Sequence, residues 1–285
     1  MGLIDEAVAR SAPLLHRTAQ SARGGDGPNR IPVGTSVAIR DIRYTHTRCV
    51  DVARALLRRN RVISGFDRCF YTDVYRILAT QVSQRLRTNG WSTLAVTSPG
   101  RSEGKTLTAI NLAVSLAAEF NQTALLVDAD LWRPSVSTYF GLEGEAGLSD
   151  YLLSNKPLGD LLIHPGIPGF VFLPGGAPSA KSSEALGSYS MGELVQELKT
   201  RYLGRIVVFD LPPLLDTADV LAFAPYIDAA LLVVEEGKTL RGDVKRACEL
   251  LTNTHLLGTI LNKSTEVKVP RESRRRFAKW FSRDA

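Results

Sequence analysis

The sequence predicts an α/β fold: a doubly wound, mainly parallel sheet with helices on both faces. Between residues 94 and 262, apolar runs of strand length alternate with longer segments of helical periodicity. The apolar runs are nearly continuous, as in strands that are buried on both faces. The chain has 285 residues, of which 44% are hydrophobic, and this is enough for one large core.

The elements are expected in a regular order. A helix over 71–88 comes first, with these apolar residues on one face: Val74, Ile77, Leu78 and Val82. Strands are then expected at 94–98, 123–128, 205–209, 229–234 and 256–262. The accompanying helices are expected at 105–119, 190–202, 217–225 and 240–252. Residues 134–190 are expected to be a looser region.

Three parts of the chain are distinguished by composition. Residues 1–65 are expected to form a basic, partly flexible extension, residues 66–265 the main domain, and residues 266–285 a basic, aromatic tail. Within the extension we expect a short amphipathic helix over 2–20 and a basic helix over 47–60.

Charge is distributed unevenly along the chain. The net charge is +6, with net basic segments at 1–90 and 267–285 around a net acidic middle. Basic ends indicate either an interaction with an anionic surface or partner, or solvated arms. Three scattered cysteines favour a reducing compartment, and no apolar run has the length of a membrane span. We therefore expect a cytoplasmic protein.

A glycine-containing turn joins the strand at 94–98 to the helix at 105–119. Its residues are Gly100, Arg101, Ser102, Glu103, Gly104, Lys105, Thr106 and Leu107. In such a turn backbone N–H groups hold phosphates, the lysine adds charge at the β- and γ-phosphates, and the threonine hydroxyl can bind Mg²⁺. Pro99 replaces the first glycine of the strict pattern G-x-x-x-x-G-K-[ST]. The turn predicts a nucleoside triphosphate site.

Carboxylates stand at the ends of two predicted strands. Asp128 and Asp130 follow one apolar run, and Asp210 follows another. Because the carboxyl ends of parallel strands meet at one edge, these acids are expected beside Lys105. Each alone also fits a helix cap or a turn. Together with the hydroxyl of Thr106 they supply the oxygen ligands that Mg²⁺ prefers.

These motifs resemble those of the bacterial tyrosine kinases (BY-kinases) of exopolysaccharide and capsule biosynthesis. The resemblance covers roughly residues 70–265 and is carried by Asp128-Ala129-Asp130-Leu131-Trp132-Arg133-Pro134-Ser135, Asp210-Leu211-Pro212-Pro213 and Gly258-Thr259-Ile260-Leu261-Asn262-Lys263-Ser264. It implies a P-loop kinase domain that transfers the γ-phosphate of ATP to tyrosine with Mg²⁺.

The resemblance also implies roles for single residues. Lys105 stabilises the charge on the transferred phosphoryl group. Thr106, Asp128 and Asp210 hold the metal, Asp128 helps to accept the tyrosine proton, and Asp130 supports the metal or the substrate. Residues 100–107 and Asn262 bind the nucleotide.

The same resemblance implies partners. These are a membrane polysaccharide chain-length regulator of the co-polymerase type, further copies of the chain in a homo-oligomer, and a position at the inner face of the cell membrane. No nucleic acid partner is expected. The helix through which the family associates carries Glu-x-x-Arg-x-x-Arg, whereas the matching positions here hold Asp73, Arg76 and Ala79.

Residues 266–285 lack the tyrosine cluster of this family, because the last tyrosine is Tyr226. Phe277, Trp280 and Phe281 instead lie at helical spacing among arginines, which fits a helix on an anionic membrane or a disordered basic tail. Two functions therefore stay open: a tyrosine kinase, or an ATPase switch that regulates a membrane- or partner-bound complex without tyrosine kinase activity.

Overall fold

The computed structural model describes residues 47–63, 70–119, 122–201 and 204–264. The strands are β1 (Arg48–Cys49), β2 (Thr93–Thr97), β3 (Thr123–Asp128), β4 (Ile163–His164), β5 (Phe170–Leu173), β6 (Arg205–Asp210), β7 (Ala229–Glu235) and β8 (His255–Asn262). The helices are α2 (Arg54–Arg59), α3 (Phe70–Asn89), α4 (Lys105–Glu119), α5 (Val136–Tyr139), α6 (Leu148–Ser154), α7 (Leu158–Leu161), α8 (Ser182–Leu186), α9 (Tyr189–Arg201), α10 (Asp219–Phe223) and α11 (Arg241–Leu250), with a 3-10 turn, η2, at Ala224–Tyr226.

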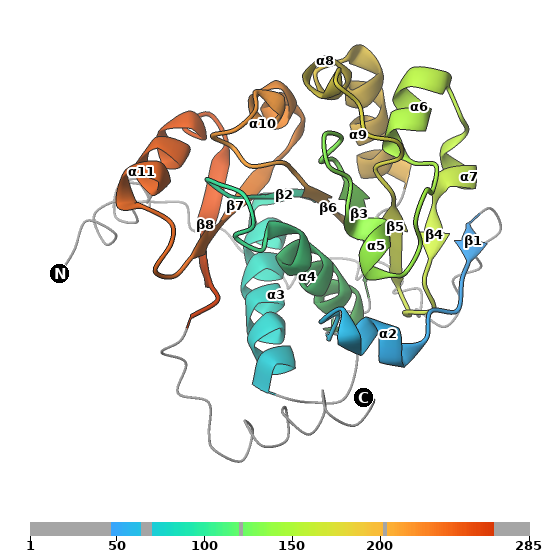
Figure 1. The fold of residues 1–285 in the computed structure, drawn as a ribbon, viewed down its shortest axis with the longest axis horizontal. Coiled ribbons are helices and arrows are strands. Elements are labelled where there is room, and N and C mark those ends of the chain that lie inside the picture. The colour runs from blue at the N-terminus through green and yellow to red at the C-terminus, as the bar shows by residue number, and fades with distance from the viewer. Residues whose placement is uncertain (1–46, 64–69, 120–121, 202–203, 265–285) are drawn as a thin grey trace, which may run out of the picture. The chain divides into compact units, whose positions relative to one another are not determined.

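The eight strands form one sheet in the order β1-β4-β5-β3-β6-β2-β7-β8 (Figure 1). All neighbouring pairs are parallel except β4 and β5, which are antiparallel. β2 is a central strand. Strands β3 to β6 lie on one side of it and strands β7 and β8 lie on the other. This confirms the predicted doubly wound, mainly parallel sheet.

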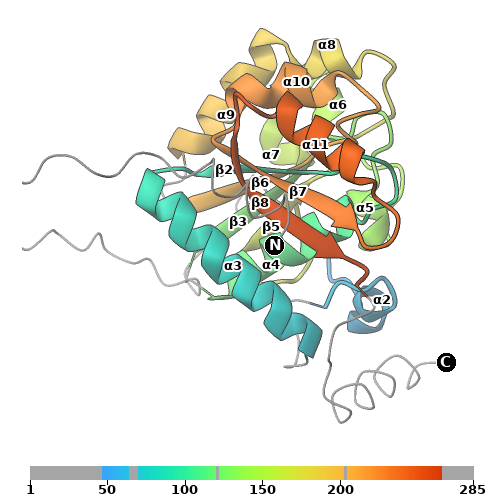
Figure 2. The same cartoon turned by 90° about the vertical axis from the view of Figure 1, so that its left-hand side faces the viewer.

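Two cores lie on opposite faces of the sheet. Leu125 and Val127 of β3 pack into the core under α9 to α11, whereas Ala124 and Leu126 pack against α4. Figure 2 shows α3 and α4 on one side of the strands and α9, α10 and α11 on the other. Because both faces of the central strands are covered, their sequences are continuous apolar runs.

The expected strands and helices from 94 to 262 occur within two residues of their predicted ends, apart from the helix predicted over 217–225. There the α-helix covers only Asp219–Phe223, and its last turn tightens into η2, where Pro225 lacks the N–H of an α-helical bond.

The looser region predicted at 134–190 is wrong, because it contains α5 to α8 and two strands. β5 is only four residues long and β4 only two. Such short strands leave too few apolar residues for a periodic signal, and here they are fixed by pairing with β3 and with each other.

The basic helix predicted over 47–60 is also shorter than expected. The helix covers Arg54–Arg59, and Arg48–Cys49 instead pairs with β4. Leu57 and Val62 are buried in the same core as α4. These residues belong to the segment that we assigned to the extension 1–65, and here they pack onto the sheet domain. The rest of that segment up to residue 46, and the tail 266–285, lie outside the described residues.

The buried face of α3 agrees with the predicted one at Val82 and Leu78 but not at Val74 and Ile77. Val74 and Ile77 are 47% and 60% exposed, whereas Ala79, Val82 and Leu86 are buried. Packing against α4 therefore turns the buried face toward Ala79 and Leu86. In the described part of the chain, no helix has both the length and the hydropathy needed to cross a bilayer.

Candidate active site

The turn between β2 and α4 lies at the centre of the sheet, and its backbone takes two unusual conformations. Gly104 has a φ of +94°, and a Cβ at this position would lie 2.0 Å from Nδ2 of Asn262. Ser102 has a φ of +62°, which a residue with a side chain adopts only at a cost. A glycine at 104 therefore allows both the turn and the close approach of Asn262.

Replacing Gly104 by alanine is expected to weaken ATP binding by about tenfold or more, because the new methyl group displaces Asn262 and strains the turn. Titration calorimetry with ATP and Mg²⁺ measures this. Gly90→Ala is the matched control, since Gly90 also has a positive φ but has nothing within 4 Å of its added Cβ. Equal affinities of the two variants would contradict the role given to Gly104.

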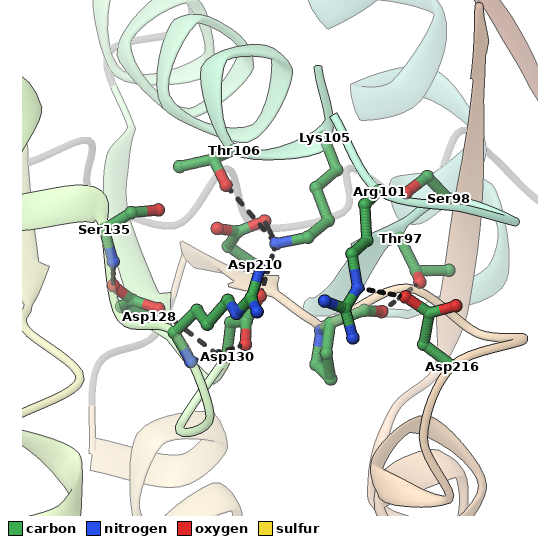
Figure 3. A network of polar contacts seen from close by, with 12 residues as sticks. Thr97, Ser98, Arg101, Lys105, Thr106, Asp128, Asp130, Ser135, Asp210 and Asp216 are labelled. Carbon is green, nitrogen blue, oxygen red and sulfur yellow. Dashed lines mark hydrogen bonds and ion pairs between the residues drawn. The ribbon is translucent and has the colours of Figure 1, made fainter. Parts of the chain in front are cut away.

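Lys105, the first residue of α4, points into a group of oxygen atoms (Figure 3). Its Nζ lies 2.8 Å from Oδ2 of Asp130, 3.5 Å from Oδ1 of Asp210 and 3.3 Å from Oγ1 of Thr106. Burial by itself lowers the pKa of Lys105, but Asp210 and Asp130 outweigh burial and raise this pKa above its usual value. The lysine is therefore held as a cation at the carboxyl edge of the sheet.

Asp128 and Asp210 are direct neighbours in the register of β3 and β6. Asp128 is fully buried, and its Oδ2 accepts the N–H groups of Ser135 and Val136 at 2.8 and 2.9 Å. Burial and the negative charge of Asp210 raise the pKa of Asp128 to about 7. A carboxyl with this pKa is suited to exchange a proton near neutral pH.

Asp210 is fully buried as well, and burial raises its pKa although Lys105 and the Thr106 hydroxyl act in the opposite direction. Its Oδ2 has no hydrogen-bond partner within the described residues. A buried oxygen without a partner, next to a threonine hydroxyl and a second carboxylate, fits a Mg²⁺ ion. In the described part of the chain no three His, Cys, Asp or Glu side chains form a metal cluster by themselves, so an ion here would share the phosphate oxygens of a nucleotide.

The structure brings the predicted site residues together. Thr106, Asp130 and Asp210 contact Lys105, and Asp128 is the neighbour of Asp210 in the strand register. Asn262 of β8 donates from Nδ2 to the carbonyl oxygen of Glu103 at 2.9 Å. The remaining predicted residues, Gly100, Arg101, Ser102 and Leu107, form the turn and the first turn of α4.

Four residues that contact this turn were not predicted from the sequence. Asp216 binds Arg101, with 2.5 Å between Oδ2 and Nε. Lys238, Thr239 and Lys263 contact the turn from the ends of β7 and β8. These partners lie more than 100 positions from the turn. Lys263 stands in the motif that ends at Ser264, which marked Asn262 as a site residue but gave no role to the lysine.

A strand, a phosphate-type turn and a helix at the centre of a parallel sheet, with carboxylates at the same edge, define the class of P-loop nucleotide-binding proteins. No protein-family model matches the chain. Individual relatives do match. The chain is 31% identical over 208 residues to tyrosine-protein kinase YwqD of Bacillus subtilis (strain 168), which covers 72% of this chain and 86% of that protein.

A second relative, tyrosine-protein kinase CpsD of Streptococcus agalactiae serotype Ia, is 31% identical over 61% of this chain and 75% of its own length. The succinoglycan biosynthesis transport protein ExoP of Rhizobium meliloti (strain 1021) is 30% identical over 77% of this chain but only 28% of its own length. Among solved structures, the kinase domain of Escherichia coli tyrosine kinase ETK superposes with a TM-score of 0.62 at 28% identity, over 67% of this chain and 74% of that domain. The chain therefore belongs to the family of bacterial tyrosine-protein kinases.

Proposed function

We propose that this chain transfers the γ-phosphate of ATP to a protein tyrosine, with Mg²⁺, in the biosynthesis of an exopolysaccharide or capsule. The observation that carries the proposal is the position of Lys105 among Thr106, Asp130 and Asp210 at the edge of the sheet. The names of the relatives, tyrosine-protein kinases and a succinoglycan biosynthesis transport protein, support the substrate class and the setting.

The reaction needs positioning and charge stabilisation more than covalent chemistry. The tyrosine oxygen forms a bond to the γ-phosphorus, the bond to the β–γ bridging oxygen breaks, and ADP leaves with that electron pair. Lys105 stabilises the charge on the transferred group, and Asp128 accepts the tyrosine proton. Thr106, Asp128 and Asp210 would hold Mg²⁺, which would neutralise phosphate charge. Asp130 orients Lys105.

An assay with two readouts tests this function. The protein is incubated with γ-labelled ATP and Mg²⁺, with and without the cytoplasmic segment of its membrane partner. We expect acid-stable label on tyrosine as well as released phosphate. Phosphate release without any phosphotyrosine under both conditions would contradict the kinase and favour the ATPase switch.

The partner that we propose is a membrane polysaccharide chain-length regulator. In ExoP the region similar to this chain is 28% of a longer protein that is named for transport, which supports such a pairing. We propose in addition that the tail 266–285 binds an anionic membrane surface, on the strength of its arginines and aromatic residues. Co-sedimentation with anionic vesicles that does not change on deletion of 270–285 would refute the role of the tail.

A further inference from the structure

Three consecutive carbonyl groups of the phosphate turn each accept a hydrogen bond from a distant side chain. Nζ of Lys238 donates to Arg101 O at 3.1 Å, and Nζ of Lys263 donates to Ser102 O at 2.7 Å. Asn262 binds the third carbonyl, that of Glu103. We call Lys238, Asn262 and Lys263 the collar. The collar holds the outer side of the turn at three successive residues.

The side chain of Glu103, a residue of the same turn, also stabilises it through hydrogen bonds. This side chain is almost fully buried, and its Oε2 accepts the N–H of Gly100 at 2.9 Å. Its Oε1 accepts the hydroxyl of Thr239, which follows Lys238 in the loop after β7. Both carboxylate oxygens are therefore used to join the start of the turn to the loop that carries Lys238.

One acid orients both lysines of the collar. Oε2 of Glu235 lies 3.3 Å from Nζ of Lys238 and 2.9 Å from Nζ of Lys263. Hydrogen bonding to Lys263, and then to Lys238, keeps the pKa of Glu235 below its usual value. The acid thus stays charged at neutral pH and fixes the two ammonium groups against the turn.

The backbone on both sides of this contact is strained. Ser102 and Lys263 both have positive φ angles, of +62° and +56°, and neither is glycine. The side chain of Lys263 donates to the carbonyl of Ser102, so the two strained residues are joined directly. Strain of this kind persists where the surrounding contacts hold it in place, and it gathers at functional sites.

The hydrogen bonds from the two lysines end on carbonyl oxygens of the turn, and this points to a role in nucleotide binding. A turn that binds phosphates must present its N–H groups inward, and its carbonyl groups must then point away. We propose that Lys238 and Lys263 are positioning residues of the nucleotide site. They hold the carbonyl groups of Arg101 and Ser102 outward, so that the N–H groups of the turn face the phosphates. This inference rests on the nucleotide binding of the proposed function.

The two lysines touch main-chain atoms of the turn and not the transferred group, so they support every bound nucleotide alike. We expect Lys238→Met and Lys263→Met each to raise the dissociation constants of ATP·Mg²⁺ and of ADP·Mg²⁺ by about five- to tenfold. The factor is expected to be equal for the two nucleotides. The turnover number at saturating ATP is expected to change by less than about twofold, because uniform binding affects KM alone.

Lys245→Met is the matched control. Lys245 lies on α11 with its side chain 80% exposed, and its Nζ is 3.9 Å from Oε1 of Glu249. This variant loses the same charge without touching the turn and is expected to bind both nucleotides as the wild type does. Lys263→Arg keeps a charged donor and is expected to recover part of the affinity.

Each result of the titrations decides the proposal. Affinities of Lys238→Met and Lys263→Met within twofold of the wild type would overturn it, as would an equal loss in Lys245→Met or a lower melting temperature with unchanged affinity. A wild type that binds no nucleotide would overturn both the proposed function and the collar. Normal wild-type binding without phosphotyrosine, combined with the predicted losses, would remove the kinase reaction and leave the collar standing.

Discussion

Phosphotransfer by Lys105→Met is expected to be about 100- to 1,000-fold slower than by the wild type. Lys105 is the buried cation of the site, with its Nζ 2.8 Å from Asp130, and methionine keeps the length of the side chain but not its charge. Without the ammonium group, no charged side chain of α4 offsets the negative charge that moves with the γ-phosphoryl group. The loss is expected mainly in the turnover number.

The comparison is made by measuring initial rates of phosphotyrosine formation at saturating ATP and Mg²⁺. Lys156→Met serves as the control, because Lys156 makes an ion pair of the same 2.8 Å length with Asp150 but is 48% exposed and lies on another loop. We expect its rate to match that of the wild type. A Lys105→Met variant that is folded and retains more than about a tenth of the rate would disprove the assignment of this lysine.

Asp128→Asn is expected to have two opposite effects. Phosphotransfer falls by about 100-fold or more, because the carboxyl that accepts the proton is lost. The free energy of unfolding at pH 8 rises by a few kcal/mol at most, because the wild type there carries a fully buried charge at this position and the variant does not. The amide oxygen of asparagine can still accept the N–H groups of Ser135 and Val136.

The raised pKa of Asp128 fixes the direction in which the stability of the protein changes with pH. The pKa of Asp128 is about 7 in the folded protein, whereas an unperturbed aspartate has a pKa of 3.8, so between these values the folded state binds more protons than the unfolded state. The stability from this group is complete below pH 4 and is lost as the pH rises through about 7. The nucleotide-free wild type should therefore become less stable from pH 5 to pH 8.

Denaturant unfolding at pH 5 and pH 8 measures this loss. Asp128→Asn should show a smaller loss than the wild type, though not a zero loss, because burial also raises the pKa of Asp210. Asp160→Asn, at an exposed position on α7, should follow the wild type. A wild type that gains stability over this range would contradict the buried, proton-binding state of Asp128.

Much of the site could be predicted from the sequence because its residues stand where strands end. The apolar run 123–128 gives β3 with the same bounds, and the run that ends in Asp210 gives β6. Once two strands are known to be parallel neighbours, their terminal acids must meet. The phosphate turn is a local motif between such a strand and a helix, so its position at the same edge of the sheet could also be predicted from the sequence.

The remaining features depend on packing between distant segments. Lys238 and Lys263 of the collar contact the turn from distant parts of the chain. Although Lys263 stands in the motif that ends at Ser264, the motif does not show that its side chain binds the turn. The buried face of α3 is decided by the contact with α4, which selects Ala79 and Val82 over Val74 and Ile77. Periodicity finds the helix but does not fix which side of its apolar face is buried most deeply.

Calorimetric titration of the wild type with ATP, in the presence and absence of Mg²⁺, tests the central claim most directly. The claim is that the turn before Lys105 binds the phosphates while Thr106, Asp128 and Asp210 hold the metal. We expect one site per chain with a dissociation constant of about 1 μM to 1 mM, weakened when Mg²⁺ is removed and again in Asp210→Asn. No heat of binding, or an affinity that is the same with and without Mg²⁺ and in Asp210→Asn, would contradict the account.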